Sequence, residues 1–267
     1  MTAVGHWFRR LTGAVTSTPG ASTPGGMGGD GARTAEGVRV YAVGDIHGRA
    51  DLLDRLNARI REDITAHADR TPLVVYLGDY VDRGQDSRAV LETLSGDPVP
   101  GVETRFLRGN HEDVMLAFMN DPVAAHAWLE FGGRQTLSAY GVPVPGATSE
   151  AILEDMATGM RAALPDRHAA FLRSLPLHTE CGDYLFVHAG VRPGVPMSQQ
   201  KPADLMYIRE PFLSHRKPLS HMIVHGHHVT EHPVVRANRI GIDTGAFATG
   251  CLTCLVLDGT ERAFITT

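Results

Sequence analysis

The chain has 267 residues, of which 43% are hydrophobic, and a formal net charge of −5 with a pI near 6.3. This length and composition predict one large α/β domain with a substantial core. The mildly acidic charge gives no reason to expect nucleic acid as a partner, so any attraction for anions must be local. No signal peptide and no stretch of 18 apolar residues is visible, so a cytoplasmic location is expected.

Residues 1–37 differ in composition from the rest of the chain. They hold nine glycines, together with Ser, Thr and Pro, and no acidic residue precedes Asp30. Such a stretch buries too little apolar surface to offset its ordering entropy, so we expect a disordered tail followed by a single catalytic domain over residues 38–267. Residues 7–11, WFRRL, could form a short basic amphipathic helix that docks weakly on a membrane or a partner; a tail without this role is the simpler alternative.

Three short polar segments each follow an apolar run that reads as a buried strand. The runs are residues 38–43, 73–77 and 104–107, and the segments are GDIHG, GDYVDRG and GNHE, which begin at Gly44, Gly78 and Gly109. In open α/β sheets the active site lies at the carboxyl ends of the strands. The sequence therefore predicts that the three segments meet at one site.

The side chains delivered there are oxygen and imidazole ligands, namely Asp45, His47, Asp79 and Asn110. This mixture suits manganese, iron or zinc better than calcium or a thiolate-bound metal. The carboxylate of Asp79, at the end of the second strand, can bridge two ions. Two divalent cations about 3.5–4 Å apart would clamp a phosphate and hold a shared hydroxide for in-line attack. We predict two such ions, manganese first, with iron and zinc as alternatives.

Two further residues of the second segment complete this chemistry. Arg83 offers a planar fork of donors that matches phosphate oxygens. Asp82 can orient His111, which could then stay protonated and donate to the leaving oxygen. Each motif alone has a structural explanation as a turn, a solvated loop or a helix start capped by Asn110. Their occurrence in order, each after a strand, favours the catalytic interpretation.

The remaining elements follow from hydrophobic periodicity and turn signals. Helices are expected over residues 49–67, 87–94, 111–120, 123–131, 149–163 and 166–174, with breaks at residues 132–133 and 141–146. Strands are expected over residues 178–181, 184–187, 222–224, 239–242, 251–257 and 262–266. Cys251 and Cys254 fall in one of these strands, on opposite faces, which favours core packing over a zinc or redox site.

The pattern GDxHG, GDxxDRG and GNHE, followed by two single histidines, resembles the phosphoprotein phosphatase (PPP) family and its bacterial serine/threonine protein phosphatase branch. The resemblance implies a four-layer αββα calcineurin-like fold with two mixed sheets. It implies that the first metal is bound by Asp45, His47 and Asp79, and the second by Asp79, Asn110, His188 and His227. It implies that phosphate is bound by Arg83, Arg209, Asn110 and His111.

The late histidines need separate weighing, because the chain has 14 in all. His225 shares a face of the strand end with His227 and is its rival for the metal; the Gly-His order of the family favours His227. His228 stands where bacterial members often carry threonine, and no role is assigned to it. In the wider superfamily the GHxH motif ends in a histidine, and Val229 at that position favours the PPP branch over the nuclease-like branches.

The expected activity is hydrolysis of phosphomonoesters, with protein phosphoserine or phosphothreonine, or a phosphorylated small molecule, as substrate. The alternative is hydrolysis of diadenosine tetraphosphate or a related nucleotide polyphosphate. Symmetrical dinucleoside tetraphosphatases usually lack an aspartate at the position of Asp82 and carry GNHD, whereas this chain has Asp82 and Glu112, which favours the protein phosphatase. A binding module without catalysis would need a lost ligand, and none of the six is missing.

Overall fold

The computed structural model describes residues 31–267, so the predicted basic helix of the tail lies outside the described residues. Residues 31–37, which composition groups with the tail, already pack on the domain. Ala32 is buried and its carbonyl accepts a hydrogen bond from the Tyr184 hydroxyl, while the Arg33 amide donates to the Asp183 carboxylate. The packed chain therefore begins before the predicted boundary at residue 38, because this segment finds backbone partners in a hairpin distant in sequence.

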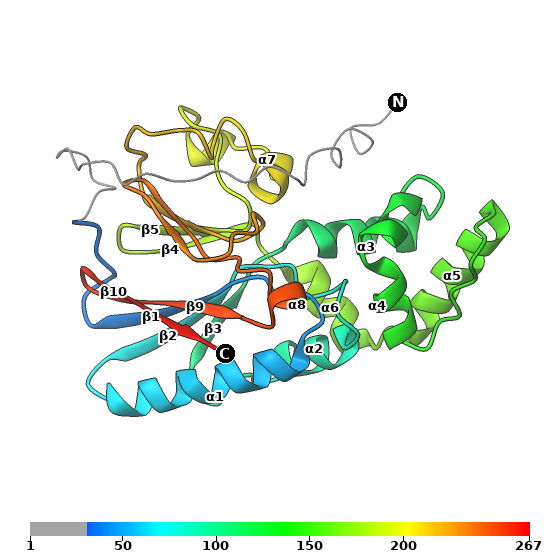
Figure 1. Cartoon of the computed structure of the whole chain (residues 1–267), viewed down its shortest axis with the longest axis horizontal. Coiled ribbons are helices and arrows are strands. Elements are labelled where there is room, and N and C mark those ends of the chain that lie inside the picture. Colours follow the sequence, from blue (N-terminus) through cyan, green and yellow to red (C-terminus); the bar gives the residue numbers. More distant parts are fainter. Residues whose placement is uncertain (1–30) are drawn as a thin grey trace.

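Two five-stranded sheets form the centre of the molecule (Figure 1). The first has the order β10-β9-β1-β2-β3, with β1, β2 and β3 parallel and β9 antiparallel to β1. Its strands are β1 (Val38–Val43), β2 (Thr71–Tyr76), β3 (Glu103–Phe106), β9 (Thr253–Asp258) and β10 (Glu261–Thr266). The second has the order β4-β5-β6-β8-β7 and is also mixed. Its strands are β4 (His178–Cys181), β5 (Tyr184–Val187), β6 (Met222–His225), β7 (Val234–Val235) and β8 (Arg239–Gly241).

The alternation of side chains along β1 shows how the layers are held. Val40 and Ala42 join a buried cluster between the two sheets, whereas Tyr41 and Val43 join a second cluster with the helices. Helices α1 (Ala50–Ala66) and α2 (Ser87–Leu94) cover that outer face (Figure 1). Full burial of one such aliphatic side chain stabilises the fold by about 1.5–3 kcal/mol.

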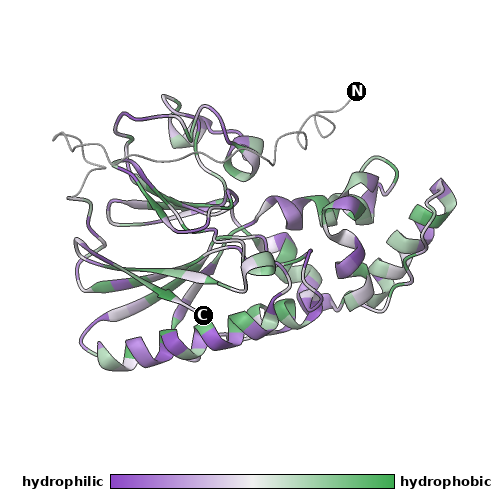
Figure 2. Ribbon diagram, viewed as in Figure 1, coloured by the Kyte–Doolittle hydropathy of each residue, from purple (hydrophilic) through white to green (hydrophobic). Residues whose placement is uncertain are grey.

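The second sheet is covered on its outer face as well. Helix α7 (Pro202–Tyr207) and the chain after it pack Leu205 and Phe212 against Leu185 and Val187. The order of layers is therefore helix, sheet, sheet, helix, as expected. Figure 2 shows that α1 carries both polar and apolar residues along its length, as a helix with one buried face should.

A helical insert between β3 and β4 projects from one end of the sandwich (Figure 1). It comprises α3 (Asn110–Asn120), the 3-10 helix η2 (His126–Phe131), α4 (Gly133–Ala139), α5 (Glu150–Ala163) and α6 (Asp166–Ser174). The predicted break at residues 132–133 is only partly right. Gly132 has φ 108°, but α4 starts at Gly133, which packs so closely on the Trp128 ring that a Cβ would overlap it.

Four further short elements escaped prediction, namely η3 (Met197–Gln199), α7, β7 and α8 (Ala246–Thr249), because they are too short to show a periodicity. The expected strand over residues 251–257 begins two residues later, so Cys251 is half-buried outside it and only Cys254 is a core residue. Within residues 31–267, no helix combines the length and the apolar character needed to cross a membrane.

Candidate active site

The six predicted metal ligands come together at one end of the two sheets. Asp45 and His47 follow β1, Asp79 follows β2, and Asn110 starts α3 after β3. His188 and His227 follow β5 and β6 of the other sheet. All six side chains are buried. Residues spread over more than 180 positions of the sequence therefore share one buried polar site.

The backbone of this site is held in an unusual conformation. Within residues 31–267, the non-glycine residues with positive φ are all predicted site residues: His47 (47°), Asp79 (52°), Asp82 (75°), Arg83 (67°) and His227 (63°). A non-glycine residue in this region costs of order 1–3 kcal/mol and persists only where its surroundings fix it. Because all of these residues with positive φ lie in the motif loops, the backbone conformation supports the assignment of a functional site.

Two motif glycines are required by close approach. A Cβ at Gly109 would overlap Oδ1 of Asp79, and a Cβ at Gly226 would overlap Oδ1 of Asp45. These glycines let backbone pass directly against the carboxylates of the site.

One group of ligand atoms is formed by Asp79, His188 and His227, whose atoms lie within 4.8 Å of one another. Nε2 of His188 is 3.0 Å from Oδ1 of Asn110 and 3.3 Å from Oδ1 of Asp79. Nδ1 of His188 faces the carbonyl of Leu77 at 3.0 Å, so that nitrogen carries a hydrogen and donates. Nε2 points toward two oxygens that are themselves acceptors, so this position attracts a positive charge, either a proton or a metal ion.

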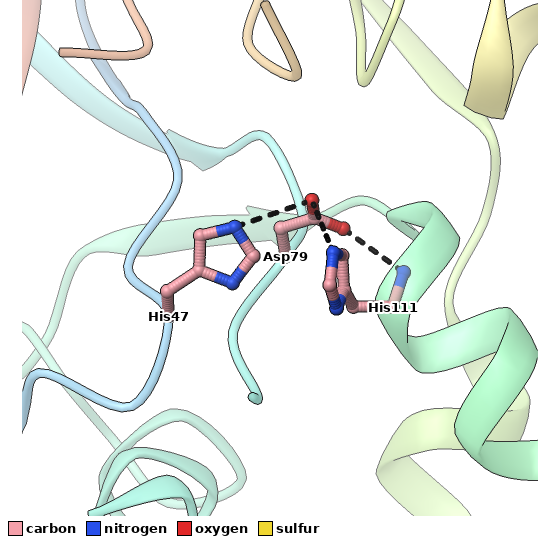
Figure 3. A group of neighbouring side chains, drawn as sticks. All are labelled: His47, Asp79 and His111. Carbon is pink, nitrogen blue, oxygen red and sulfur yellow. Dashed lines mark hydrogen bonds and ion pairs between the residues drawn. The ribbon is translucent and has the colours of Figure 1, made fainter. Parts of the chain in front are cut away.

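The second group comprises His47, Asp79 and His111 (Figure 3). Oδ2 of Asp79 is 3.6 Å from Nε2 of His47 and 3.9 Å from Nε2 of His111. Nδ1 of His47 faces the carbonyl of Val81 at 2.9 Å, so the other ring nitrogen is presented to Asp79. Asp79 belongs to both groups, the position that a bridging carboxylate requires.

Charge explains why these groups suit cations. Burial alone would raise the pKa of Asp79, but the charges of His188 and His111 outweigh it and hold that pKa well below its usual range. Burial lowers the pKa of His188, yet the charge of Asp79 and their hydrogen bond raise it above its ordinary value. Burial, with the charges of Asp243 and Asp79, raises the pKa of Asp45 well above its usual range. The ionised form of Asp45 is therefore disfavoured in this buried site, and a divalent ion bound beside it would stabilise that form.

The geometry differs from the expectation at Asp45. Its carboxylate accepts the backbone N–H of His227, at 2.9 and 3.2 Å from the two oxygens, and it is not a member of either compact group. Its assignment to the first metal therefore stays a prediction, and His111 occupies the place beside His47 and Asp79.

The proposed acid, His111, is held by a network that sequence reasoning found only in part. Its Nδ1 is 2.6 Å from Oδ2 of Asp82. The same oxygen accepts from Nε1 of Trp128 at 2.7 Å, and Oδ1 accepts from the Thr136 hydroxyl at 2.6 Å. Burial lowers the pKa of His111, but the charge of Asp79 and the hydrogen bond with Asp82 raise it above its ordinary value. Trp128 and Thr136 lie in the helical insert, with no local motif to mark them.

The two predicted phosphate-binding arginines each have an ordered neighbour. The Arg83 guanidinium lies over the Phe247 ring, 4.5 Å from its centroid, and 3.5 Å from Nε2 of His111. Nη1 of Arg209 is 3.0 Å from Nδ1 of His228, the histidine that had no predicted role.

His225 and His227 have different neighbours in the structure. Nδ1 of His225 faces the carbonyl of Gly226 at 3.0 Å, its ring packs edge-on against Phe212, and it belongs to neither ligand group. His227 Nδ1 lies 3.2 Å from Nε2 of His188. The structure therefore places His227, and not His225, among the candidate ligands.

Two further acidic residues of the site are Glu112 and Asp243. The Glu112 carboxylate accepts the backbone N–H groups of Asp79, Tyr80, Val81 and Gly109 at 2.7–3.2 Å, so it ties two motif loops together. Burial raises its pKa to about 7. Asp243 was missed: it is buried after β8 and accepts the Gly245 N–H at 2.9 Å. The rule used for the other ligands, a polar residue closing an apolar strand, would have found it.

Two stacked mixed sheets with carboxylate, carboxamide and imidazole ligands at the strand ends form a site suited to divalent metal ions. Residues 38–248 match the model of the calcineurin-like phosphoesterase family. The chain therefore belongs to that family.

Curated relatives are similar over part or most of the chain. A symmetrical bis(5'-nucleosyl)-tetraphosphatase of Acidovorax sp. (strain JS42) is 36% identical over 165 residues, 58% of this chain and 45% of that protein. The chain thus spans about half the length of that relative. An asymmetrical bis(5'-nucleosyl)-tetraphosphatase, PrpE, of Bacillus cereus (strain Q1) is 24% identical over 234 residues, 80% of this chain and 88% of the relative.

Solved structures show the same fold at low sequence identity. One, assigned only provisionally as a diadenosine tetraphosphatase, has a TM-score of 0.59 at 20% identity and covers 88% of this chain and 98% of its own. A cold-active protein-tyrosine phosphatase of a psychrophilic Shewanella has a TM-score of 0.51 at 16% identity, covering 87% and 83%. These similarities concern the fold alone.

Proposed function

We propose that this chain hydrolyses dinucleoside polyphosphates, with diadenosine tetraphosphate as the first substrate to test. The observation that carries the chemistry is that Asp79 belongs to both groups of candidate ligands, so the site can hold two cations around one carboxylate. The choice of substrate rests on the two groups of curated relatives, both of which are bis(5'-nucleosyl)-tetraphosphatases.

The metal ligands, the arginines and His111 would each have a separate role in the reaction. Asp45, His47 and Asp79 would hold one divalent ion, and Asp79, Asn110, His188 and His227 the other, with manganese first and iron or zinc as alternatives. When bound, such ions neutralise phosphate charge and acidify water. Arg83 and Arg209 bind the non-bridging phosphate oxygens. His111 gives a proton to the leaving oxygen, and Asp82 keeps its ring in position.

This proposal reverses the preference drawn from the motifs. Asp82 and Glu112 favoured a protein phosphatase, but the structure shows what these side chains touch: His111, two residues of the insert and the backbone of the motif loops. Neither residue has a described contact that would let it recognise the organic part of a substrate. They are therefore weak evidence on specificity, and the relatives favour the nucleotide alternative.

Phosphoserine or phosphothreonine in proteins remains a second candidate on one specific observation. The buried pair of Asp82 and His111, 2.6 Å apart, is suited to protonating a leaving oxygen. A serine oxygen is a poor leaving group and needs that proton more than a nucleotide phosphate does.

One comparison separates the two candidates. The full chain, stripped of metal and reloaded with Mn²⁺, should be assayed with diadenosine tetraphosphate, a phosphopeptide panel and p-nitrophenyl phosphate. We expect kcat/KM for diadenosine tetraphosphate to exceed that for the best phosphopeptide by about tenfold or more, a difference of about 1.4 kcal/mol in transition-state stabilisation. A phosphopeptide preferred by the same margin would overturn the proposal. The products, two ADP or AMP with ATP, would identify the bond cleaved.

A further inference from the structure

A cleft lies beside α7, next to the candidate active site. Its volume is about 310 Å³, at the lower end of the range for small-molecule sites. Residues of α7, the segment 208–210 that follows it, and Arg192 line this α7 cleft. Arg209 lines it and is also one of the two predicted phosphate-binding arginines.

Arg209 joins the α7 cleft to the reaction site. Its guanidinium donates to Nδ1 of His228, which directly follows the candidate ligand His227. Arginine only donates, so Nδ1 of His228 is the acceptor, and this bond fixes the direction of the guanidinium. A ring nitrogen does so without placing a negative charge beside Arg209, as a carboxylate would. Because Arg209 also lines the α7 cleft, a phosphate bound by its guanidinium would lie at the mouth of the cleft.

Beyond Arg209 the charged residues that line the cleft are Arg192, Asp204 and Glu210, so its walls carry no excess positive charge. Arg192 and Asp204 form a two-point ion pair, with N–O distances of 2.9 and 2.5 Å, so their charges offset each other. The hydroxyl of Tyr207 donates to Oδ2 of Asp113 at 3.3 Å, which holds the tyrosine ring in one orientation. A fixed aromatic ring in a wall without excess positive charge suits a flat, uncharged organic group better than a further phosphate.

The backbone of the cleft argues against an extended peptide. A peptide in extended conformation commonly binds by adding a strand to a free sheet edge. The residues that line the α7 cleft belong to a helix and to loops, and none of them lies in a described strand. A compact group is therefore the better occupant.

We propose that the α7 cleft binds the nucleoside end of a nucleotide substrate whose phosphate lies at Arg209. This inference rests on the proposed function, since it adds a contact with the base of the nucleotide substrate proposed above. Tyr207 provides the ring against which the base packs, and Ala203, an exposed residue of α7, lies at the rim.

The test compares two inhibitors of p-nitrophenyl phosphate hydrolysis by the Mn²⁺-loaded full chain. ADP and pyrophosphate share a diphosphate, and only ADP carries a nucleoside. We expect ADP to inhibit at about tenfold lower concentration than pyrophosphate, and Tyr207→Ala to bring the ratio of inhibition constants close to one. This loss corresponds to the about 1–3 kcal/mol that stacking one base on an aromatic ring contributes. Tyr207→Phe, which keeps the ring and removes the bond to Asp113, is the matched control and should keep most of the preference.

A second variant guards against misfolding. Ala203→Trp adds bulk at an exposed rim position, so it should fold and still lower the ADP preference by occluding the cleft. The proposal that the cleft binds a nucleoside would be overturned by equal inhibition by ADP and pyrophosphate in the unmodified chain. It would also be overturned if the ratio of their inhibition constants were unchanged in both Tyr207→Ala and Ala203→Trp. If diadenosine tetraphosphate were still hydrolysed efficiently in that case, the proposed function would stand without it. Failure to hydrolyse diadenosine tetraphosphate at all would overturn the function itself.

Discussion

Asp79 shows how many requirements one residue of this site meets. Its backbone is left-handed, its N–H is held by Glu112, and glycine at position 109 makes room for its carboxylate. That carboxylate faces the rings of His47 and His111 on one side and His188 on the other. The position tolerates neither another charge nor another shape.

Asp79→Asn keeps the shape and removes the charge. We expect activity to fall by more than about 100-fold, beyond the effect of a residue that only orients a ligand, and metal content to fall by at least one ion per chain. Activity assays and elemental analysis measure the two effects, and circular dichroism checks the fold. Asp69→Asn, at an exposed position, is the control. Full metal content together with full activity in Asp79→Asn would exclude a bridging role.

The proton donor can be tested at the same scale through the leaving group. His111→Ala and Asp82→Asn should lower kcat by about 10²–10⁴ for substrates with poor leaving groups, the usual reach of general acid catalysis. The loss should shrink for p-nitrophenyl phosphate, whose leaving group needs little protonation, with metal content nearly constant. Losses of equal size for both kinds of substrate would mean that His111 positions phosphate or metal instead.

Among the elements of the helical insert, η2 and α4 support Asp82 through the indole of Trp128 and the hydroxyl of Thr136. Trp128 on η2 donates to the same oxygen of Asp82 that holds His111. Trp128→Phe keeps an aromatic ring in the core but leaves that buried acceptor one donor short, which costs about 1–3 kcal/mol. We expect kcat to fall about tenfold with poor leaving groups and less with p-nitrophenyl phosphate. An unchanged kcat would show that the indole of Trp128 does not support the proton donor.

Some of the helices and strands could be predicted from the sequence, and others could not. β1 and α2 were predicted to the residue, and the ends of β1, β2 and β3 were located because each motif directly follows an apolar run. The elements missed were too short for a periodicity, and Trp128 and Thr136 reach Asp82 across 46 and 54 residues. Local patterns report the loops that carry ligands, whereas the side chains that support those ligands from a distance depend on tertiary packing.

In the molecule as a whole, residues 31–37 pack against segments distant in sequence. Thr34 exchanges hydrogen bonds with Gly259, its N–H donating at 3.2 Å and its hydroxyl accepting at 2.9 Å. Deleting residues 1–30 should leave kcat and Tm nearly unchanged. Deleting residues 1–36 removes these bonds and the buried Ala32, at about 0.5–1.5 kcal/mol per bond, so Tm should fall by several degrees. Equal Tm values for both truncations, measured by calorimetry, would show that residues 31–36 add no stability.

We infer that one buried site, shared by the two sheets, holds two divalent ions around Asp79. Anomalous diffraction from a crystal of the chain loaded with Mn²⁺ would locate these ions. We expect two peaks, one beside His47 and Asp79 and one beside Asp79, Asn110, His188 and His227, with each imidazole nitrogen at about 2.0–2.3 Å from its ion. A metal bonded to His225 with His227 turned away, or no peak in contact with Asp79, would contradict it.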